Sequence, residues 1–224
     1  DEFDEPIVES ATFNEDLSGW NVSQVTNMES MFYEATAFNQ PIGNWDVSNV
    51  TNFKTTFRGS AYNQPLNDWD VEGAQLMVGM FFGSAYNQPL DSWAFPNVNS
   101  LENLFKSSAF NQPLNSWDVS GIINMNSTFA FSAYNQSLSD WDVSGVTNMK
   151  RAFQGSAMEL DLSNWDVSSV SNFYETFMNA PGMNFSLGGW NIAQATSFTR
   201  TLEGSGISAL NYSQTLIGWA TQTL

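Results

Sequence analysis

The sequence predicts an α/β repeat fold, a solenoid with parallel strands on one face and short helical turns on the other. Tryptophan spacing is the first observation behind this prediction, because eight of the nine tryptophans recur every 24 or 25 residues, from Trp20 to Trp190. The second is the longer motif around each tryptophan, seen as FNQPIGNWDVSNVTNF from Phe38 and FNQPLNSWDVSGIINM from Phe110. One such unit cannot bury its apolar side chains alone, whereas stacked coils share a continuous core.

The expected strand is the segment Leu-x-x-Trp-x-Val, which begins at Leu17 in the first repeat. Apolar and polar residues alternate in its second half, and this period of two is typical of a strand. The alternation points each Trp inward with its Val. We therefore expect Trp69, Trp117 and Trp141 to be buried in the core rather than to form a sugar-stacking platform.

The expected helical segment follows, with Met-x-x-x-Phe spaced by one helical step of four. A Thr or Ser often precedes it, as at Thr26 and Thr51, where an N-cap would stand. Glycine ends the segment in several repeats, as at Gly59 and Gly83. Each coil is therefore expected to consist of a short strand, a turn, one or two helical turns and a return.

Asparagine follows the aromatic residue in six successive repeats, at Asn14, Asn39, Asn63, Asn87, Asn111 and Asn135. Buried backbone N–H and C=O groups need partners, and an amide side chain supplies both a donor and an acceptor. We expect this row to satisfy backbone groups of the neighbouring coil. The alternative is a binding face made of amides.

The chain divides into three parts. Residues 1–12 form an N-terminal lead-in, residues 13–205 hold about eight 24-residue repeats, and residues 206–224 form a C-terminal capping helix. We expect the helix over 208–221, with Tyr212, Leu216 and Trp219 facing the core. The acidic residues 1–10 should be loosely held, and a start at Asp1 rather than Met indicates a processed protein or part of a larger chain.

Composition excludes several functions. With 23 acidic and 6 basic residues the net charge is −17, which argues against nucleic acid and anionic membrane surfaces as partners. Without Cys or His, thiolate sites, the commonest general base and the commonest transition-metal ligand are lacking. No apolar run is long enough to span a bilayer, so no membrane insertion is expected. We predict neither an enzyme nor a bound cofactor.

The candidate ligand-binding residues are acidic side chains next to the tryptophans. They share the face opposite the inward Trp and Val, whereas all six Lys and Arg residues fall in the helical segments. The row comprises Asp46, Asp68, Asp70, Glu72, Asp118, Asp140, Asp142 and Asp166. Alternatively each Asp that follows a Trp only caps a turn with the Ser two residues on, as Asp46 would with Ser48.

Asp68, Asp70 and Glu72 form the densest part of this row. They are the best candidates for binding a cation, and calcium is a cation that favours oxygen ligands. Calcium binding sites need six to eight oxygens, and no Asp-x-Asp-x-Asp-Gly loop is present. We therefore assign no metal site and keep calcium as an alternative. Carboxylate pairs can hydrolyse glycosides, but the same Asp recurring in five repeats is unlike a catalytic pair.

A second candidate contact surface lies in the expected helical segments. Tyr33 and Phe82 stand where other repeats carry Arg58 and Lys106, and Val78 stands where its neighbours carry Lys54 and Glu102. Exposed apolar clusters usually have a function. Tyr33, Val78 and Phe82 are therefore a candidate apolar contact patch, unless a neighbouring segment covers them.

The string FNQPLxxWDVSxVTNMxxxF resembles the repeat of the BspA-like leucine-rich-repeat surface proteins, with Trp in place of the second Leu. The resemblance extends over residues 13–202. It implies a right-handed leucine-rich-repeat-like solenoid, an extracellular or cell-surface location and a role in adhesion, and it brings no catalytic residues. We thus expect a binding module whose acidic, Asn/Ser-rich face contacts a protein or glycan. The alternative is a passive spacer within a larger surface protein.

Overall fold

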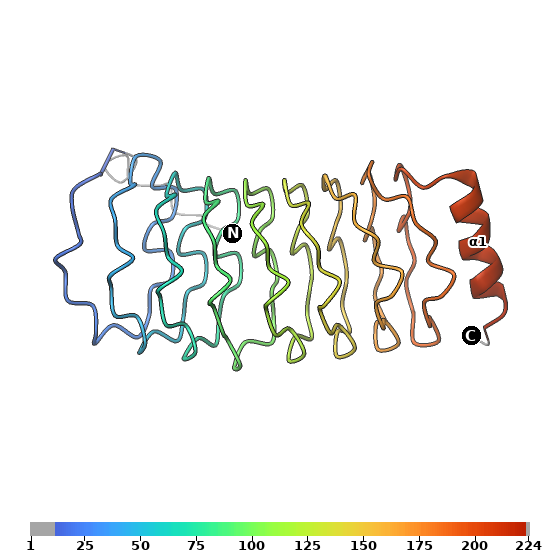
Figure 1. Ribbon diagram of the computed structural model, residues 1–224, viewed down its shortest axis with the longest axis horizontal. Helices are drawn as coiled ribbons and strands as arrows, with labels where there is room; N and C mark the ends of the chain where they lie inside the picture. Colours follow the sequence, from blue (N-terminus) through green and yellow to red (C-terminus); the bar gives the residue numbers. More distant parts are fainter. Residues whose placement is uncertain (1–11, 223–224) are drawn as a thin grey trace.

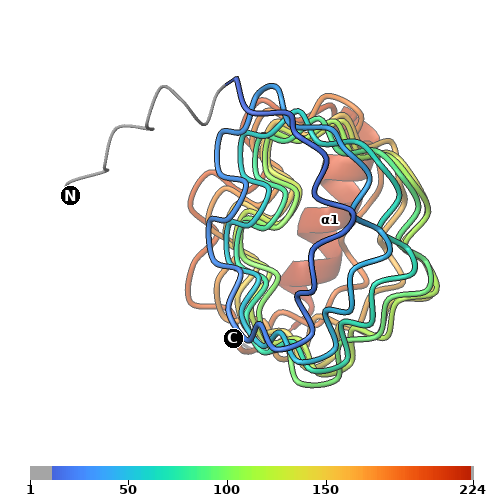
Figure 2. The same cartoon turned by 90° about the vertical axis from the view of Figure 1, so that its left-hand side faces the viewer.

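A computed structural model describes residues 12–222 of the protein. The repeats form coils that lie side by side along the long axis, and helix α1, Ala209–Ala220, closes the C-terminal end (Figure 1). Viewed along this axis the coils superimpose (Figure 2). Equivalent residues of successive repeats therefore form rows that run from one end of the molecule to the other.

The expected α/β fold is wrong. Within residues 12–222, α1 is the only helix and no strand is formed. Parallel pairing is limited to six isolated bridges, such as Asn27 with Asn52 and Asn148 with Asn172. The more specific prediction of a leucine-rich-repeat solenoid is wrong as well, because the strands and short helices that define it are missing from the described repeats.

The expected strand is replaced by two turns. In each coil the Trp backbone N–H donates to the carbonyl of the Leu or Ile three residues before it, at 3.0 Å for Trp20 and Leu17. The next turn is closed the same way, at 2.8 Å from Val25 N to Val22 O. A hydrogen bond between residues i and i+3 is the mark of a β-turn. Local turns therefore use the backbone groups that a strand would offer to its neighbours.

The expected helical segment is also a run of turns. Met31 N donates to Met28 O at 3.2 Å, and Ala35 N donates to Phe32 O at 3.2 Å, so that two turns follow one another. The third residue of each turn, Ser30 with φ 58° and Glu34 with φ 52°, is left-handed. A positive φ every four residues ends any α-helix. The spacing of four between Met and Phe is therefore the spacing of tandem turns.

We call this segment the turn row, from 28–34 in the first coil to 198–204 in the eighth. Alternate backbone N–H groups of the turn row donate to carbonyls of the next coil, as from Phe32 to Thr56 at 2.9 Å. Six of the seven junctions have four such bonds and the junction between the third and fourth coils has three, with lengths of 2.7–3.0 Å. The turn row is thus the main backbone connection between coils.

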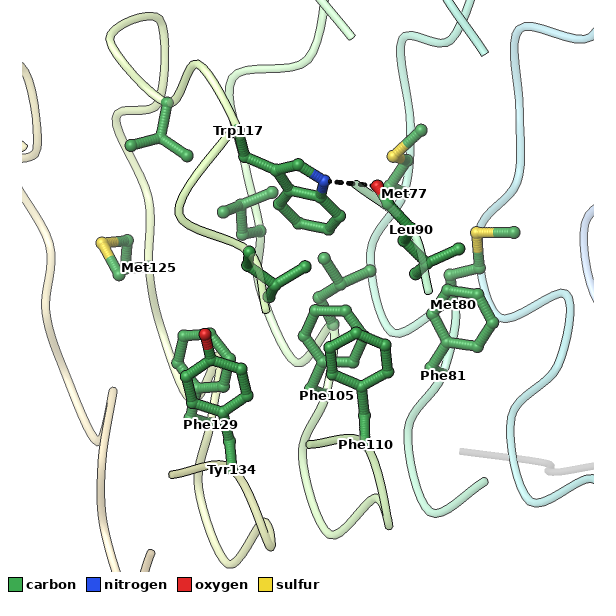
Figure 3. Packing of buried hydrophobic residues seen from close by; sticks show 14 of the residues in the cluster. Met77, Met80, Phe81, Leu90, Phe105, Phe110, Trp117, Met125, Phe129 and Tyr134 are labelled. Atoms are coloured by element: carbon green, nitrogen blue, oxygen red, sulfur yellow. Dashed lines mark hydrogen bonds between the residues drawn. The ribbon is translucent and has the colours of Figure 1, made fainter. Parts of the chain in front are cut away.

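The tryptophans make a second row. Each indole Nε1 from Trp45 onward donates to the carbonyl of the Leu or Ile of the preceding coil, at 2.8–3.1 Å. Figure 3 shows this bond between Trp117 and Leu90. Trp69, Trp117 and Trp141 are at most 4% exposed, which confirms their prediction as core residues. Because the backbone of these turns bonds within its own coil, the indoles supply the hydrogen bonds between neighbouring coils here.

Stacked aromatic rings fill the centre of the coils. The Phe residues that end the Met-x-x-x-Phe spacing stack along the axis with centroids 5.3–5.8 Å apart, at Phe32, Phe57, Phe81, Phe105, Phe129, Phe153 and Phe177. A second column runs beside it and includes Phe110 and Tyr134, 6.3 Å apart (Figure 3). Offset stacking at this spacing is favourable and adds to the burial of the rings.

The expectation for the asparagine row is confirmed. The side-chain oxygen of each Asn accepts from the backbone N–H at the equivalent position of the next coil, at 2.7–2.9 Å from Asn14 through Asn135. The last acceptor in this row serves Glu159, which replaces asparagine in the seventh repeat. The amides therefore connect coils through the backbone, as the turn row and the tryptophans do.

Helix α1 replaces a ninth coil on part of the stack. Ser208 is its N-cap, Thr221 its C-cap, and Trp219 Nε1 donates to Leu187 O at 2.8 Å. Trp219 thus packs against the core as predicted, but Tyr212 is 44% exposed and Leu216 is 46% exposed, so the expectation that they face the core is wrong. The expectation for residues 1–10 lies outside the described residues.

Candidate functional site

The aspartates that follow the tryptophans cap turns. The carboxylate of Asp118 accepts from Ser120 N at 3.0 Å and from Ser120 Oγ at 2.6 Å, and Asp46 and Asp142 make the same pair of bonds to their serines. Asp70 caps Glu72 N at 3.0 Å in a repeat without the serine. This is the turn-capping role that was the alternative to ligand binding. It uses one carboxylate oxygen and leaves each of these side chains exposed.

These carboxylates lie close enough to affect one another. Hydrogen bonds from Ser144 hold the pKa of Asp142 below its ordinary value, although the charges of Asp166 and Asp118 act to raise it. Bonds from Ser48, Ser120 and Ser168 likewise lower the pKa of Asp46, Asp118 and Asp166. These four aspartates are therefore ionised at neutral pH, and they form a line of negative charge along the stack.

The line of charge is interrupted at Ala94, and the surface is hollowed there. One depression, of about 320 Å³, is lined by residues that include Asp68, Asp70, Glu72 and Ala94. A second, of about 280 Å³, shares Glu72 and Ala94 and reaches Asp118 on the far side. We call these two depressions together the acidic groove. The structure therefore brings Asp68, Asp70 and Glu72 together, as the sequence suggested, and places Asp118 across from them.

Hydrogen bonds hold some of the polar side chains at the groove. Asn67 donates to Asp91 Oδ1 at 3.2 Å and to Ser92 Oγ at 2.9 Å, and it accepts from Ser92 N at 3.1 Å. The carboxylate of Asp68 has no hydrogen bond or ion pair with any residue in 12–222. Asp140, in contrast, accepts from Asn115 Nδ2 and lies outside the groove. The Glu72 carboxylate likewise has no such partner in this range, so Asp68 and Glu72 are the carboxylates of the cluster that are free to contact another molecule.

The acidic side chains do not converge on a metal site. Over residues 12–222 no three carboxylates are placed to hold one ion together. Asp68 and Asp70 stand on either side of Trp69 in the chain, and both side chains are exposed to solvent. The arrangement suits a surface that attracts positively charged or hydroxyl-rich groups.

All six basic side chains lie on the turn row and contact neighbours within the chain. Lys54 pairs with Glu29 at 2.9 Å, and the Arg58 guanidinium lies 5.3 Å from the Tyr33 ring centroid and 4.6 Å from that of Phe82. Lys106 covers Phe82 at 5.1 Å. The candidate patch of Tyr33, Val78 and Phe82 is therefore half-buried, and cations cover two of its side chains. Its role in contacts with another molecule stays a prediction.

The remaining cations surround a buried carboxylate. The side chain of Glu175 is 3% exposed and pairs with Arg151 at 2.7 Å and with Arg200 at 3.0 Å. Burial acts to raise the pKa of Glu175, but hydrogen bonds from Arg151 and Tyr174, together with the charges of Arg151 and Arg200, outweigh it and hold the pKa low. Lys150 and Arg151 also lie over the Tyr174 ring, at 5.5 and 5.2 Å. This network joins the sixth, seventh and eighth coils, and its burial indicates a structural role.

Sequence reasoning missed the acidic groove. The signal was present, because the fourth repeat reads WAFPNV where the second, sixth and seventh repeats read WDVSxV and both neighbouring repeats begin with WDV. The replacements put Phe95 against Trp117, with ring centroids 4.8 Å apart, and leave no carboxylate at Ala94. Only the structure shows that this departure opens a depression between Asp70 and Asp118.

No helix in the described part of the chain is long and apolar enough to cross a bilayer. A family profile described as "Mycoplasma protein of unknown function, DUF285" matches residues 3–115 and again residues 100–219. No curated protein and no solved structure matches the chain.

Proposed function

The chain belongs to the DUF285 family of Mycoplasma proteins of unknown function, and on that premise we propose that it is a binding module of a secreted or cell-surface protein. Its acidic face contacts a protein or a glycan. The kinship with BspA-like surface proteins, which the repeat motif suggests, is part of this proposal and concerns the location and the adhesive role.

The acidic groove is the observation that carries the proposal. It is the place where the repeating surface changes, and Asp68, Asp70 and Glu72 gather at its rim. A net charge of −17 concentrates negative potential there, because no Lys or Arg lies in the segments on this face. Such a surface favours a partner with Lys or Arg side chains, or a glycan whose hydroxyl groups donate to carboxylates and to Asn67 or Ser92.

Charge removal without loss of the turns tests this proposal. Asn caps the same turn in the first coil, where Asn21 Oδ1 accepts from Ser23 N at 3.1 Å. Asp68→Asn with Asp70→Asn should therefore fold normally and lose two charges at the groove. In a screen of glycans and of basic and neutral proteins, we expect ligands of the parent to bind the double variant about tenfold more weakly.

Asp166→Asn is the matched control, because it removes one charge of the same row far from the groove and keeps its turn. We expect it to change affinity less than twofold. Binding to the parent should also weaken as salt rises, since exposed charges are screened beyond about 8–10 Å at physiological ionic strength. A ligand that binds parent and double variant equally at low salt would place recognition elsewhere.

The spacer role is the second candidate, and the constancy of the coil junctions favours it. The turn row, the tryptophan row and the asparagine row repeat with little change along the stack. A spacer needs no groove, and it would show no ligand in the screen with or without millimolar calcium. A calcium-dependent rise in melting temperature, removed by the double variant, would support the cation alternative.

A further inference from the structure

The C-terminal end of the stack is only partly capped. Two of the three rows that connect coils are completed by the segment around α1. Trp219 Nε1 donates to Leu187 O at 2.8 Å, as an indole of a ninth coil would, and Ser208 N donates to Asn184 Oδ1 at 2.9 Å, as the next residue of the asparagine row would. Nothing in residues 12–222 completes the turn row.

The open part is a line of four backbone donors. At each earlier junction the N–H groups equivalent to those of Phe198, Arg200, Leu202 and Gly204 donate to the next coil, apart from one at the third junction. In the eighth coil these four N–H groups have no acceptor among residues 12–222. Unpaired backbone donors are a template for another peptide segment.

An apolar groove lies beside these donors. It has a volume of about 360 Å³. On the α1 side it is lined by Tyr212, Leu216 and Trp219, and on the coil side by Phe198 and Leu202 together with Arg200, Thr201 and Glu203. The side chains of Tyr212 and Leu216 are almost half exposed, although they belong to this groove. Donors and apolar side chains thus stand together, as they do inside the stack at every junction.

We propose that this end binds a single peptide segment of the repeat type, which completes the turn row. The junctions inside the stack indicate the features of this segment. Its carbonyl groups at alternate residues accept from the four donors, and two of its apolar side chains, four residues apart, enter the groove. Backbone hydrogen bonds then supply affinity and the apolar pockets supply selectivity, as in other cases of peptide addition to an open edge.

A whole second copy fits this end less well. Its first tryptophan, Trp20, would have to reach Leu187 O, which already accepts from Trp219. Helix α1 has a diameter of about 10 Å, whereas adjacent coils stack their rings 5.3–5.8 Å apart. The helix therefore keeps a second stack from approaching over its full width, while a lone segment needs only the edge that α1 leaves open.

The first coil supplies a probe. The carbonyls of Asn27, just before its turn row, and of Glu29, Met31 and Tyr33 within it stand at the positions that accept in later coils, and none of the four accepts a hydrogen bond within 12–222. A synthetic peptide of residues 26–36, TNMESMFYEAT, presents this row with a charge of −2. The net charges of the peptide and of the protein, which carries −17, therefore repel each other, and Arg200 at the groove is already paired with Glu175 and Glu203.

The experiment is a titration of the whole chain with this peptide, followed by amide hydrogen exchange. We expect the amide protons of Phe198, Arg200, Leu202 and Gly204 to exchange rapidly in the protein alone and to become protected when the peptide is added. A control peptide with Ser in place of Met28 and Phe32 should give no protection. Absence of protection at millimolar peptide would overturn the proposal.

Two variants of α1 test whether the peptide binds in the groove beside this helix. Leu216→Glu puts a charge into the groove and should weaken peptide binding about tenfold or more. Ile217→Glu is the matched control, because Ile217 is 66% exposed on the same helix and does not line the groove. We expect it to change binding less than twofold. Equal loss in both variants would contradict the site.

Measurements on the protein without peptide show whether a second copy of the chain occupies this edge instead. If the four amides are protected without peptide at high protein concentration, and this protection disappears on dilution together with a dimer in light scattering, a second copy covers the edge. That result would overturn the peptide proposal. None of these outcomes depends on Asp68 or Asp70, so failure here is separate from failure of the acidic groove as a ligand site.

Discussion

The hydroxyl of Tyr62 is buried in the aromatic column and has no well-formed hydrogen bond with residues 12–222, although the Ile42 backbone lies close enough to act against the rise in pKa that burial causes. Phe38 and Phe110 fill the same position in other coils. A buried polar group without a partner lowers stability, so Tyr62→Phe should leave the free energy of unfolding unchanged or raise it by about 1 kcal/mol. Denaturant unfolding measures it.

Tyr134→Phe is the control for this substitution. The Tyr134 hydroxyl donates to Ser137 O at 3.5 Å, so its removal should lower stability slightly or leave it unchanged. A larger loss in the Tyr62 variant than in the Tyr134 variant would show that the Tyr62 hydroxyl has a partner in solution, such as water.

The aspartate caps make a prediction about pH. The folded-state pKa of Asp118 is held below 3.8 by the hydrogen bonds from Ser120. A depressed pKa contributes stability that is complete above the unfolded value and disappears as pH falls through the folded value. Asp118→Ala should therefore melt below the parent at pH 7, and this difference should shrink as pH falls below 3.8.

Asp118→Asn separates the cap from the charge. Its amide oxygen can accept from Ser120 as Asn21 does from Ser23, so we expect it to melt closer to the parent than Asp118→Ala does at pH 7. If both variants melt alike at pH 7, the cap adds nothing to stability, and the recurrence of Asp at this position in five repeats would require another explanation.

Among the elements, α1 depends on a contact between two glycines. A Cβ on Gly218 would meet the carbonyl oxygen and Cα of Gly188. Helix propensity favours Ala over Gly by about 1 kcal/mol, but overpacking at a rigid contact costs about 1–3 kcal/mol. We expect Gly218→Ala to loosen α1 and to expose Trp219 to solvent, which tryptophan fluorescence and thermal melting detect.

Gly189→Ala is the matched control, since a Cβ there meets nothing within 4 Å. It should leave melting and fluorescence unchanged. A Gly218→Ala variant as stable as the Gly189→Ala variant would mean that α1 moves easily on the last coil.

The features set by recurring side chains could be predicted from the sequence, whereas those set by backbone conformation could not. The buried tryptophans, the asparagine row and α1 follow from which side chains recur and from the Ser208 cap, so the sequence contains them. The turns do not follow in the same way. A spacing of four is shared by helices and tandem turns, and residues such as Ser30, Arg151 and Glu175 adopt left-handed φ values without the glycine that would signal it.

The candidate site shows the same division. Asp68, Asp70 and Glu72 could be named from the sequence because they stand together in the chain. The hollow beside them could not, because it depends on how the coil around Ala94 and Phe95 settles against its neighbours. The open donors of the last coil could not be predicted either. The segment was expected to be helical, and the backbone N–H groups of a helix bond within the helix itself.

For the whole molecule, position along the stack should decide what a tryptophan contributes. Trp117 is 3% exposed, bonds to Leu90 and stacks on Trp141, so Trp117→Ala should lower the free energy of unfolding by about 3–5 kcal/mol. Trp20 is 56% exposed in the first coil, and Trp20→Ala should change it by about 0.5 kcal/mol. Chemical denaturation compares the two. Similar losses would mean that the end coil is as ordered as the middle.

Every junction along the turn row has the same sense, with amides of one coil donating toward the carbonyls of the next. Any coil can therefore follow any other. Excision or duplication of one whole repeat rejoins a donor edge to an acceptor edge and leaves both ends of the molecule intact. Unequal recombination between the related repeats can in this way lengthen or shorten the protein in steps of one coil. The reach of the chain would then evolve separately from the groove and the cap.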